Sequence, residues 1–194
     1  QHLINELIKR SQLPFELLIN THHHGDHTAG NISFKGLVKN VLAHENSKAN
    51  QERVAKEKKN EDQQLYPNQT YATTWSQAVG TEEIAMHYFG AAHTNGDSFV
   101  HFKNANIVHT GDLVFNRRHP FVDRSAGANI KSWIQVLDKA DKTFNDKTIF
   151  VCGHAADGYD IVVNKKDIGA FKNYLSKVLE FTDAEIKAGK TKEE

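Results

Sequence analysis

An apolar run over residues 15–21 leads directly into a cluster of histidines and an aspartate, and this junction restricts the fold more than any other feature of the chain. Four of the six residues after the run are candidate metal ligands: His22, His24, Asp26 and His27. Imidazole nitrogens and carboxylate oxygens are good donors for zinc and similar divalent ions. Residues i and i+2 of an extended segment point the same way, so His22 and His24 are expected to hold one ion together. After the turn that Gly25 permits, Asp26 and His27 are expected to reach a second ion.

This cluster differs from an affinity tag, because it follows an apolar strand and contains an aspartate. A lone histidine is more often structural than a ligand, but several possible ligands at this spacing indicate a metal site. His23 alternates away from its neighbours, so we expect it to pack or to face solvent. A structural or surface role is also expected for His44, His87, His101 and His109, and a core position for Cys152.

Hydrophobic periodicity predicts strands and helices along the rest of the chain. Helices are expected over residues 2–12, where Pro14 stops the helix, and over 129–144, with Asn129 as the N-cap. A last helix is expected with Asp167 as its N-cap. Strands are expected over residues 15–21, 41–43, 83–89, 98–102, 106–110 and 148–153. Residues 28–36 are expected to form a short helix or turn, and the polar stretch 45–64 a solvated helix and loop. This pattern indicates a layered α/β protein, and no boundary divides residues 1–194 into separate domains.

The charge balance and the length of the apolar runs bear on the partners of the chain, and its first residues bear on the compartment. Lys plus Arg and Asp plus Glu both number 24, which gives no electrostatic reason to expect nucleic acid or an anionic membrane as partner. No apolar run approaches the roughly 20 residues that span a bilayer. We therefore expect a small-molecule substrate, with the oligomeric state left open. The start of the chain resembles no signal peptide and lacks Met, which fits a fragment or a processed form whose targeting signal has been removed.

Three further motifs place a possible ligand beside a predicted strand. Residues 90–97 read GAAHTNGD and contain His93, residues 108–112 read VHTGD and end on Asp112, and residues 151–154 read VCGH and end on His154. Together with the first cluster, this order resembles the metallo-β-lactamase superfamily, whose pattern is H-x-H-x-D-H, then a histidine, an aspartate and a G-H. The resemblance runs from about residue 17 to 180. It implies a four-layered αββα sandwich with metals at one edge between the sheets.

The resemblance also implies the ligand assignment. The first metal is assigned to His22, His24 and His93, and the second to Asp26, His27 and His154, with Asp112 bridging both. Two zinc ions are the default, with iron or manganese as alternatives. Such a pair would lower the pKa of a bridging water towards about 7, giving a hydroxide for hydrolysis. Asp26 is a candidate to orient that hydroxide, and Thr21, Thr94 and Asp97 are candidates to fix the histidine tautomers.

The sequence departs from the family pattern at its start. Family members usually have several strands before the first histidine motif, which here begins at His22. We therefore expect the usual N-terminal strands to be lacking, which leaves hydrophobic surface on the partner sheet to be exposed or covered by something else.

The resulting function hypothesis is a dinuclear zinc hydrolase of ester, thioester, lactone or amide bonds. The alternatives are a β-lactamase, a small-phosphodiester hydrolase on the same metal core, and an inactive metal-binding domain. A di-iron redox protein fits poorly, because such relatives carry a glutamate in place of His24 and a flavin domain. Zinc β-lactamases lack the aspartate found at Asp112, so β-lactams are not expected to be the main substrates. Beyond Asp112, the residues Arg117, Arg118 and His119 are candidates to contact an anionic part of the substrate.

Overall fold

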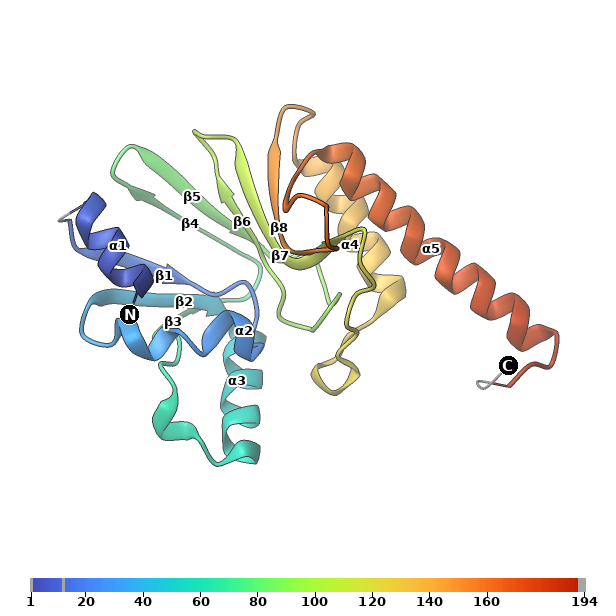
Figure 1. Ribbon diagram of the computed structural model, residues 1–194, viewed down its shortest axis with the longest axis horizontal. Coiled ribbons are helices and arrows are strands. Elements are labelled where there is room, and N and C mark those ends of the chain that lie inside the picture. Colours follow the sequence, from blue (N-terminus) through green and yellow to red (C-terminus); the bar gives the residue numbers. More distant parts are fainter. Residues whose placement is uncertain (1, 12, 192–194) are drawn as a thin grey trace.

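The computed structural model describes residues 2–11 and 13–191 and contains two β-sheets with helices outside them (Figure 1). The helices are α1 (His2–Arg10), α2 (Gly25–Thr28), α3 (Glu45–Lys58), α4 (Ile130–Thr143) and α5 (Lys165–Lys187), with 3-10 turns η1 (Asn31–Phe34), η2 (Glu61–Gln63) and η3 (Arg124–Ala126). The strands are β1 (Phe15–Ile19), β2 (Val38–His44), β3 (Gln69–Tyr71), β4 (Thr74–Val79), β5 (Glu82–His87), β6 (Phe99–Phe102), β7 (Ile107–Asn116), β8 (Ile149–Ala155) and β9 (Val162–Val163).

The smaller sheet has the order β1-β2-β3 and is parallel throughout. Ile19 at the end of β1 lies opposite Leu42 of β2, so both strands run towards the same edge of the sheet. Parallel neighbours need a crossover connection, which α3 supplies between β2 and β3. The histidine cluster follows β1 and therefore lies at the carboxyl edge of this sheet.

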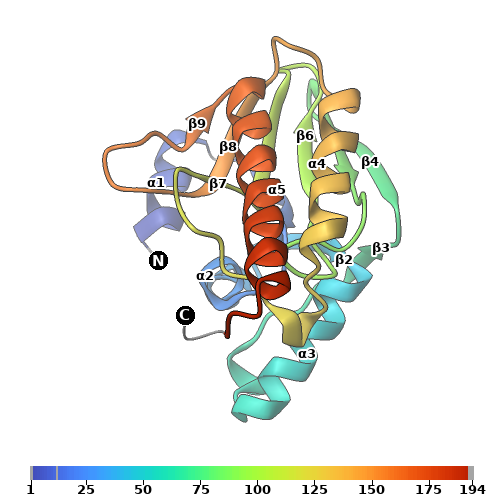
Figure 2. The same ribbon diagram turned by 90° about the vertical axis from the view of Figure 1, so that its right-hand side faces the viewer.

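The larger sheet has the order β4-β5-β6-β7-β8-β9 and is antiparallel except for the β7–β8 pair. Helices α4 and α5 lie side by side on its outer face, as Figure 2 shows. Trp133 of α4 is fully buried there, and its Nε1–H donates to the carbonyl oxygen of Leu113 at 2.9 Å. Asn129 caps α4 by accepting from the backbone N–H of Ser132, as its position predicts. The predicted layered α/β arrangement is confirmed.

A second apolar layer lies between the two sheets. Leu42 of β2 packs there with Met86 and Val100 of the larger sheet, and all three are buried. Beside this layer an apolar cleft of about 890 Å³ runs between β1 and the larger sheet, with Leu17 and Phe102 among its lining residues. Apolar side chains of both sheets, including those of Leu17 and Phe102, are thus partly exposed at this cleft.

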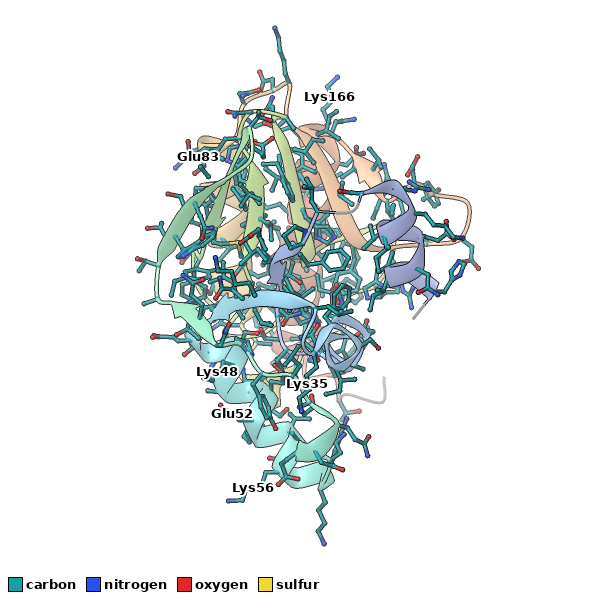
Figure 3. All side chains as sticks on the ribbon, turned by 90° about the vertical axis from the view of Figure 1, so that its left-hand side faces the viewer. Lys35, Lys48, Glu52, Lys56, Glu83 and Lys166 are labelled. Carbon is teal, nitrogen blue, oxygen red and sulfur yellow. The ribbon has the colours of Figure 1, made fainter. Side chains whose placement is uncertain are left out.

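Several local expectations need correction. Asn164 rather than Asp167 is the N-cap of α5, and Asp167 completes a capping box by accepting from the Asn164 N–H. The helix in the polar stretch 45–64 is solvated on one face only. Figure 3 shows Lys48, Glu52 and Lys56 directed outwards, whereas the opposite face of α3 buries polar residues, which are Ser47, Asn50 and Gln51.

Strands β3 and β4 were not predicted, because their residues are mostly polar or exposed and lack a clear two-residue period. The predicted first helix ends at Arg10, and residue 12, which the prediction included, lies outside the described residues. Among the described residues, none of the helices is apolar and long enough to cross a membrane.

Candidate metal centre

The first cluster of possible ligands is held by a one-turn helix. His22 and His23 follow β1, His24 is the N-cap of α2, and Asp26 and His27 lie within that helix. The carbonyl oxygen of His24 accepts the N–H of His27 at 3.0 Å, which closes the turn. The chain is thus helical rather than extended after His24. Gly25 has no left-handed backbone angle and no neighbour that a Cβ would touch, so the turn does not depend on it.

The other three residues come from the loop before β6 and from two adjacent parallel strands. His93 lies in the loop between β5 and β6, and His154 lies in β8. Asp112 lies within β7, which continues to Asn116, so the strand predicted over residues 106–110 is too short, and the observed strand contains this aspartate instead of preceding it. The β7–β8 register is irregular at Gly111, whose φ is +50°. Side chains of a regular strand alternate between the two faces of the sheet, and the irregularity breaks this alternation so that the Asp112 side chain points towards the histidines.

Two glycines leave room for this arrangement. A Cβ on Gly111 would overlap the side chain of Thr21, and a Cβ on Gly153 would overlap the Oδ1 atom of Asp112. A side chain at either position would therefore force its neighbours to move. The glycine of the G-H motif makes room for the aspartate of the preceding motif.

One group of four side chains could hold a metal ion: His22, His24, His93 and Asp112. The Nδ1 atom of His24 lies 3.1 Å from His22 Nε2 and 2.9 Å from His93 Nε2. His93 Nε2 lies 3.4 Å from the Oδ2 atom of Asp112. Nitrogen ligands about 2.0–2.1 Å from a tetrahedral zinc lie about 3.3 Å from one another, so these spacings fit one ion.

A second group could hold another ion: Asp26, His27, Asp112 and His154. His27 Nε2 lies 3.1 Å from Asp112 Oδ1 and 3.3 Å from Asp26 Oδ2. His154 Nε2 lies 3.2 Å from Asp26 Oδ2 and 3.3 Å from Asp112 Oδ2. Asp112 therefore belongs to both groups, with its two oxygens turned towards different histidines.

The electrostatics of the groups suit cation binding. Burial and the neighbouring histidines hold the pKa of His22 well below its usual value, and burial lowers the pKa of His93 to about 4. Both rings are therefore neutral at pH 7, with a lone pair free for a metal. His27 Nε2 and Asp112 Oδ1 are buried 3.1 Å from each other without the geometry of a hydrogen bond, and neither has another hydrogen-bond partner among the described residues. Buried polar atoms without a partner are costly, and a bound cation would satisfy these two.

The three histidines of the first group each have a partner on the side of the ring that faces away from the group, and this partner fixes the orientation of the ring. The Nδ1 atom of His22 lies 3.2 Å from Thr21 Oγ1, as the sequence predicts. His93 Nδ1 lies 2.7 Å from the carbonyl oxygen of Phe121, and His24 Nε2 lies 2.8 Å from Asp123 Oδ2. In each ring the nitrogen that faces the group is left unprotonated when the other donates its hydrogen.

The other two candidates for this role, Thr94 and Asp97, bond to each other instead. Both the backbone N–H and the hydroxyl of Thr94 donate to the buried Asp97 carboxylate, at 2.6 and 2.8 Å. Burial raises the pKa of Asp97 to about 7. Their contribution is to shape the loop that carries His93.

Sequence reasoning missed Asp123, which precedes the 3-10 turn η3. Its Oδ1 atom accepts from the Ser125 hydroxyl at 2.5 Å and from the Ala126 N–H at 3.1 Å. Although burial opposes ionisation, these bonds and the contact with His24 lower the pKa of Asp123 to about 2. The capping pattern of an aspartate two residues before a serine was a visible signal, but nothing in the sequence links it to a histidine 99 residues earlier.

The remaining predicted residues surround the centre. A cavity of about 260 Å³ opens onto both groups, and Arg118 and His119 line it while Arg117 does not. His23 is buried with its Nε2 atom 3.8 Å from Asp123, so it packs as expected. It also forms, with His24 and Asp123, a third group that could hold an ion.

Histidines outside the centre have structural surroundings. His44 caps α3 and stacks on Tyr88, and His87 and His101 pack against Phe144. Cys152 is buried in the core of the larger sheet and its helices, as predicted.

The chain matches a known protein family. The family model of the metallo-beta-lactamase superfamily matches residues 2–154, and the chain belongs to that superfamily. The metallo-beta-lactamase IND-1 of Chryseobacterium indologenes is 25% identical over 154 residues, which are 79% of this chain. The chain spans 61% of the length of that relative.

Solved structures share the fold. A metallo-beta-lactamase from Pontibacter korlensis superposes with a TM-score of 0.73 at 19% identity, over 90% of this chain and 75% of that one. The metallo-beta-lactamase IND-7 superposes with a TM-score of 0.67 at 22% identity, over 89% and 75% of the two chains. The arrangement of two sheets between helices is thus the sandwich of this superfamily.

Proposed function

We propose that this chain is a metal-dependent hydrolase that binds two metal ions, zinc by default, and cleaves ester, thioester, lactone or amide bonds. One observation carries the proposal: the carboxylate of Asp112 belongs to both groups of possible ligands. A shared carboxylate sets a short distance between two cations and reduces their mutual repulsion. We also propose that residues 1–194 act as one domain, since both sheets contribute ligands.

Each ligand group has a distinct duty in this proposal. His22, His24 and His93 would hold the first ion, and Asp26, His27 and His154 the second, with Asp112 between them. When bound, the two ions would lower the pKa of coordinated water and polarise the bond to be cleaved. Asp26 is the most exposed member, so its carboxylate is placed to orient a water molecule and to accept its proton.

The substrate enters by the cavity over the two groups. Arg118 and His119 line this cavity beside Asp26, so they can bind an oxygen or an anionic group of the substrate. Phe121 covers the side next to His24, where the ring centroids are 5.7 Å apart. A cavity of this small volume fits a small molecule better than a polymer.

A β-lactam amide is the second candidate substrate. It is favoured by the relatives, which carry the name metallo-beta-lactamase. The carboxylate at Asp112 argues against it as the main substrate, because zinc β-lactamases resemble this chain in other ligands but lack that aspartate. A strained lactam is nevertheless a substrate that a metal-activated water can attack.

The test combines elemental analysis with a hydrolysis panel. Protein purified without added metal is expected to contain close to two equivalents of metal per chain, and a reproducible single equivalent would contradict the second group. The metal-loaded protein is then assayed on an ester, a thioester, a lactone and a chromogenic cephalosporin. A kcat/KM for the cephalosporin above all others, in the usual enzyme range of about 10⁴–10⁸ M⁻¹s⁻¹, would make the second candidate the function. Failure to cleave any of the four would overturn the hydrolase proposal.

A further inference from the structure

A second cavity lies beside the metal centre, between the end of β7 and helix α5. Its volume is about 400 Å³, within the range of roughly 300–1,000 Å³ that is usual for ligand sites. It is lined by Phe115, Asn116, Arg117, Arg118, His119, Tyr159, Asp167, Ala170, Phe171 and Tyr174. The function proposed above does not use most of these residues.

The two cavities are neighbours that share three lining residues: Phe115, Arg118 and His119. The ring of Phe115 stacks on that of His154, with centroids 5.3 Å apart and planes 18° from parallel. Phe115 is thus a wall between a possible metal ligand and the second cavity. A molecule that reacts at the metal centre can extend an arm past Arg118 into this space.

The walls of the second cavity are aromatic. Phe115, Phe171 and Tyr174 line it, and the rings of Phe171 and Tyr174 stack with centroids 6.2 Å apart and planes at 20°. The hydroxyl of Tyr174 forms a hydrogen bond with His119 Nδ1, which joins the loop after β7 to α5. The cavity is therefore preformed, and a flat apolar group can enter it without reordering the loop.

The mouth of the cavity carries positive charge. Neither Arg117 nor Arg118 pairs with a carboxylate in the part of the chain that the structure describes. Asp167 is the acidic residue among the lining residues, and its carboxylate accepts the Asn164 N–H at 3.0 Å. Arg117 has a φ of +54°, a left-handed conformation that is uncommon outside glycine and that recurs at functional sites.

We propose that this cavity binds an arm of the substrate that consists of an apolar ring ending in a carboxylate. The inference rests on the hydrolase function proposed above and names its substrate class: acyl compounds with a second, anionic end. The ring lies against Phe115, Phe171 and Tyr174, and the carboxylate is held by Arg118 with Arg117 beside it. A guanidinium binds a carboxylate through two parallel hydrogen bonds, which a neutral group of the same shape cannot match.

The test uses two nitrophenyl esters that differ only at the end of the arm. In one the acyl chain ends in a para-carboxyphenyl ring, and in the other the carboxylate is replaced by a carboxamide. The metal-loaded wild type is expected to prefer the acid at least about tenfold in kcat/KM, mainly through KM, as one charge-assisted hydrogen bond provides. Arg118→Ala is expected to bring the two rates together, whereas Arg124→Ala, an exposed arginine that lines neither cavity, is expected to keep the preference.

A second variant tests the cavity rather than the charge. Ala170→Trp places a large ring in the cavity and is expected to slow both ring esters at least tenfold while leaving nitrophenyl acetate unaffected, because the acetyl group does not reach α5. Equal rates for the two esters in the wild type, or a preference that survives Arg118→Ala, would overturn the proposal.

A binding measurement tests the cavity independently of the hydrolase proposal. The free acid that hydrolysis of the first ester would release, a carboxyphenyl-propanoate, is titrated by calorimetry against wild type and Arg118→Ala. The comparison ligand is the matching acid from the second ester, in which a carboxamide replaces the carboxylate on the ring. Tighter binding of the dicarboxylate that is lost in Arg118→Ala supports the cavity even if no ester is cleaved, in which case the hydrolase proposal alone fails. Equal binding of acid and amide would overturn the cavity assignment whatever the rates.

Discussion

The Nε2 atom of His24 lies 2.8 Å from the Oδ2 atom of Asp123, on the side of the ring opposite the candidate metal centre. This contact leaves the Nδ1 atom of His24 free of hydrogen and directed towards His22 and His93. Asp123→Asn replaces the carboxylate by an amide that can donate to Nε2, which favours the wrong tautomer of His24. We expect the affinity for the first metal to fall about 10- to 100-fold, as measured by competition with a chromogenic chelator.

A matched control is Ser125→Ala, which removes the hydroxyl bond to the other oxygen of Asp123. Its effect on metal affinity is expected to be smaller, because the contact with His24 stays intact. Equal affinities in wild type and Asp123→Asn would mean that Asp123 supports the loop rather than the histidine.

Asp112→Ala removes the carboxylate that belongs to both groups of possible ligands. We expect turnover to be abolished and the metal content to fall from two equivalents to one, since His22, His24 and His93 can still hold an ion. Elemental analysis and the ester assay, run on the same preparation, measure both effects. A variant that kept two metals and most of its activity would show that Asp112 does not bridge.

Gly153→Ala puts a methyl group where the Oδ1 atom of Asp112 lies. The carboxylate has to move, so the content of the second metal is expected to fall while the circular dichroism of the fold is kept. Gly169→Ala in α5 is the control, because a Cβ there meets nothing within 4 Å. It is expected to leave metal content unchanged and to raise the free energy of unfolding by about 0.5–1 kcal/mol, the usual gain from alanine in a helix. Normal metal content in Gly153→Ala would contradict the steric argument.

His87, which lies outside the candidate metal centre, contributes to the pH dependence of the protein's stability. Burial, and then the charges of His101 and Lys103, lower the pKa of His87 from 6.5, and its Nε2 atom is buried without a hydrogen-bond partner among the described residues. Because the folded-state pKa is lower than the unfolded one, the unfolded chain takes up the proton first as the pH falls below about 6.5. His87 therefore makes the protein lose stability on acidification.

His87→Phe removes this titration and replaces the imidazole by a phenyl ring in the contacts with Phe89 and Phe144. We expect the urea midpoint of the variant to fall less between pH 7.5 and pH 5.5 than that of the wild type. Both proteins are measured with chelator present, so that protonation of metal ligands does not contribute. The same decrease in both would show that His87 titrates normally in the folded protein.

The sequence was sufficient for those parts of the fold and site that depend on local pattern. The apolar strand before His22, the capping of α4 by Asn129 and the buried Cys152 each follow from neighbours in the chain. The possible ligands could be proposed because they occur in short motifs whose order resembles that of a known superfamily. The structure brings them into two groups.

Other features depend on contacts between distant segments and could not be read from the sequence. Asp123 meets His24 only because the loop after β7 returns to the end of β1. The Asp112 side chain points towards the histidines because the pairing of β7 with β8 is irregular at Gly111. The alternation of apolar and polar residues in the sequence does not show such an irregularity. Strand β4 has little burial to create a period, so its pairing with β5 is visible only in the folded chain.

The possible ligands are divided between the two sheets, since His22 to His27 follow β1 whereas Asp112 and His154 belong to the larger sheet. Ions held by both sets would act as cross-links between halves of the molecule that the apolar cleft partly separates. Metal occupancy is therefore expected to govern the cooperativity of unfolding. The loaded protein should melt at a higher temperature and in a sharper calorimetric transition than the chelated protein, in which only the apolar layer joins the two sheets.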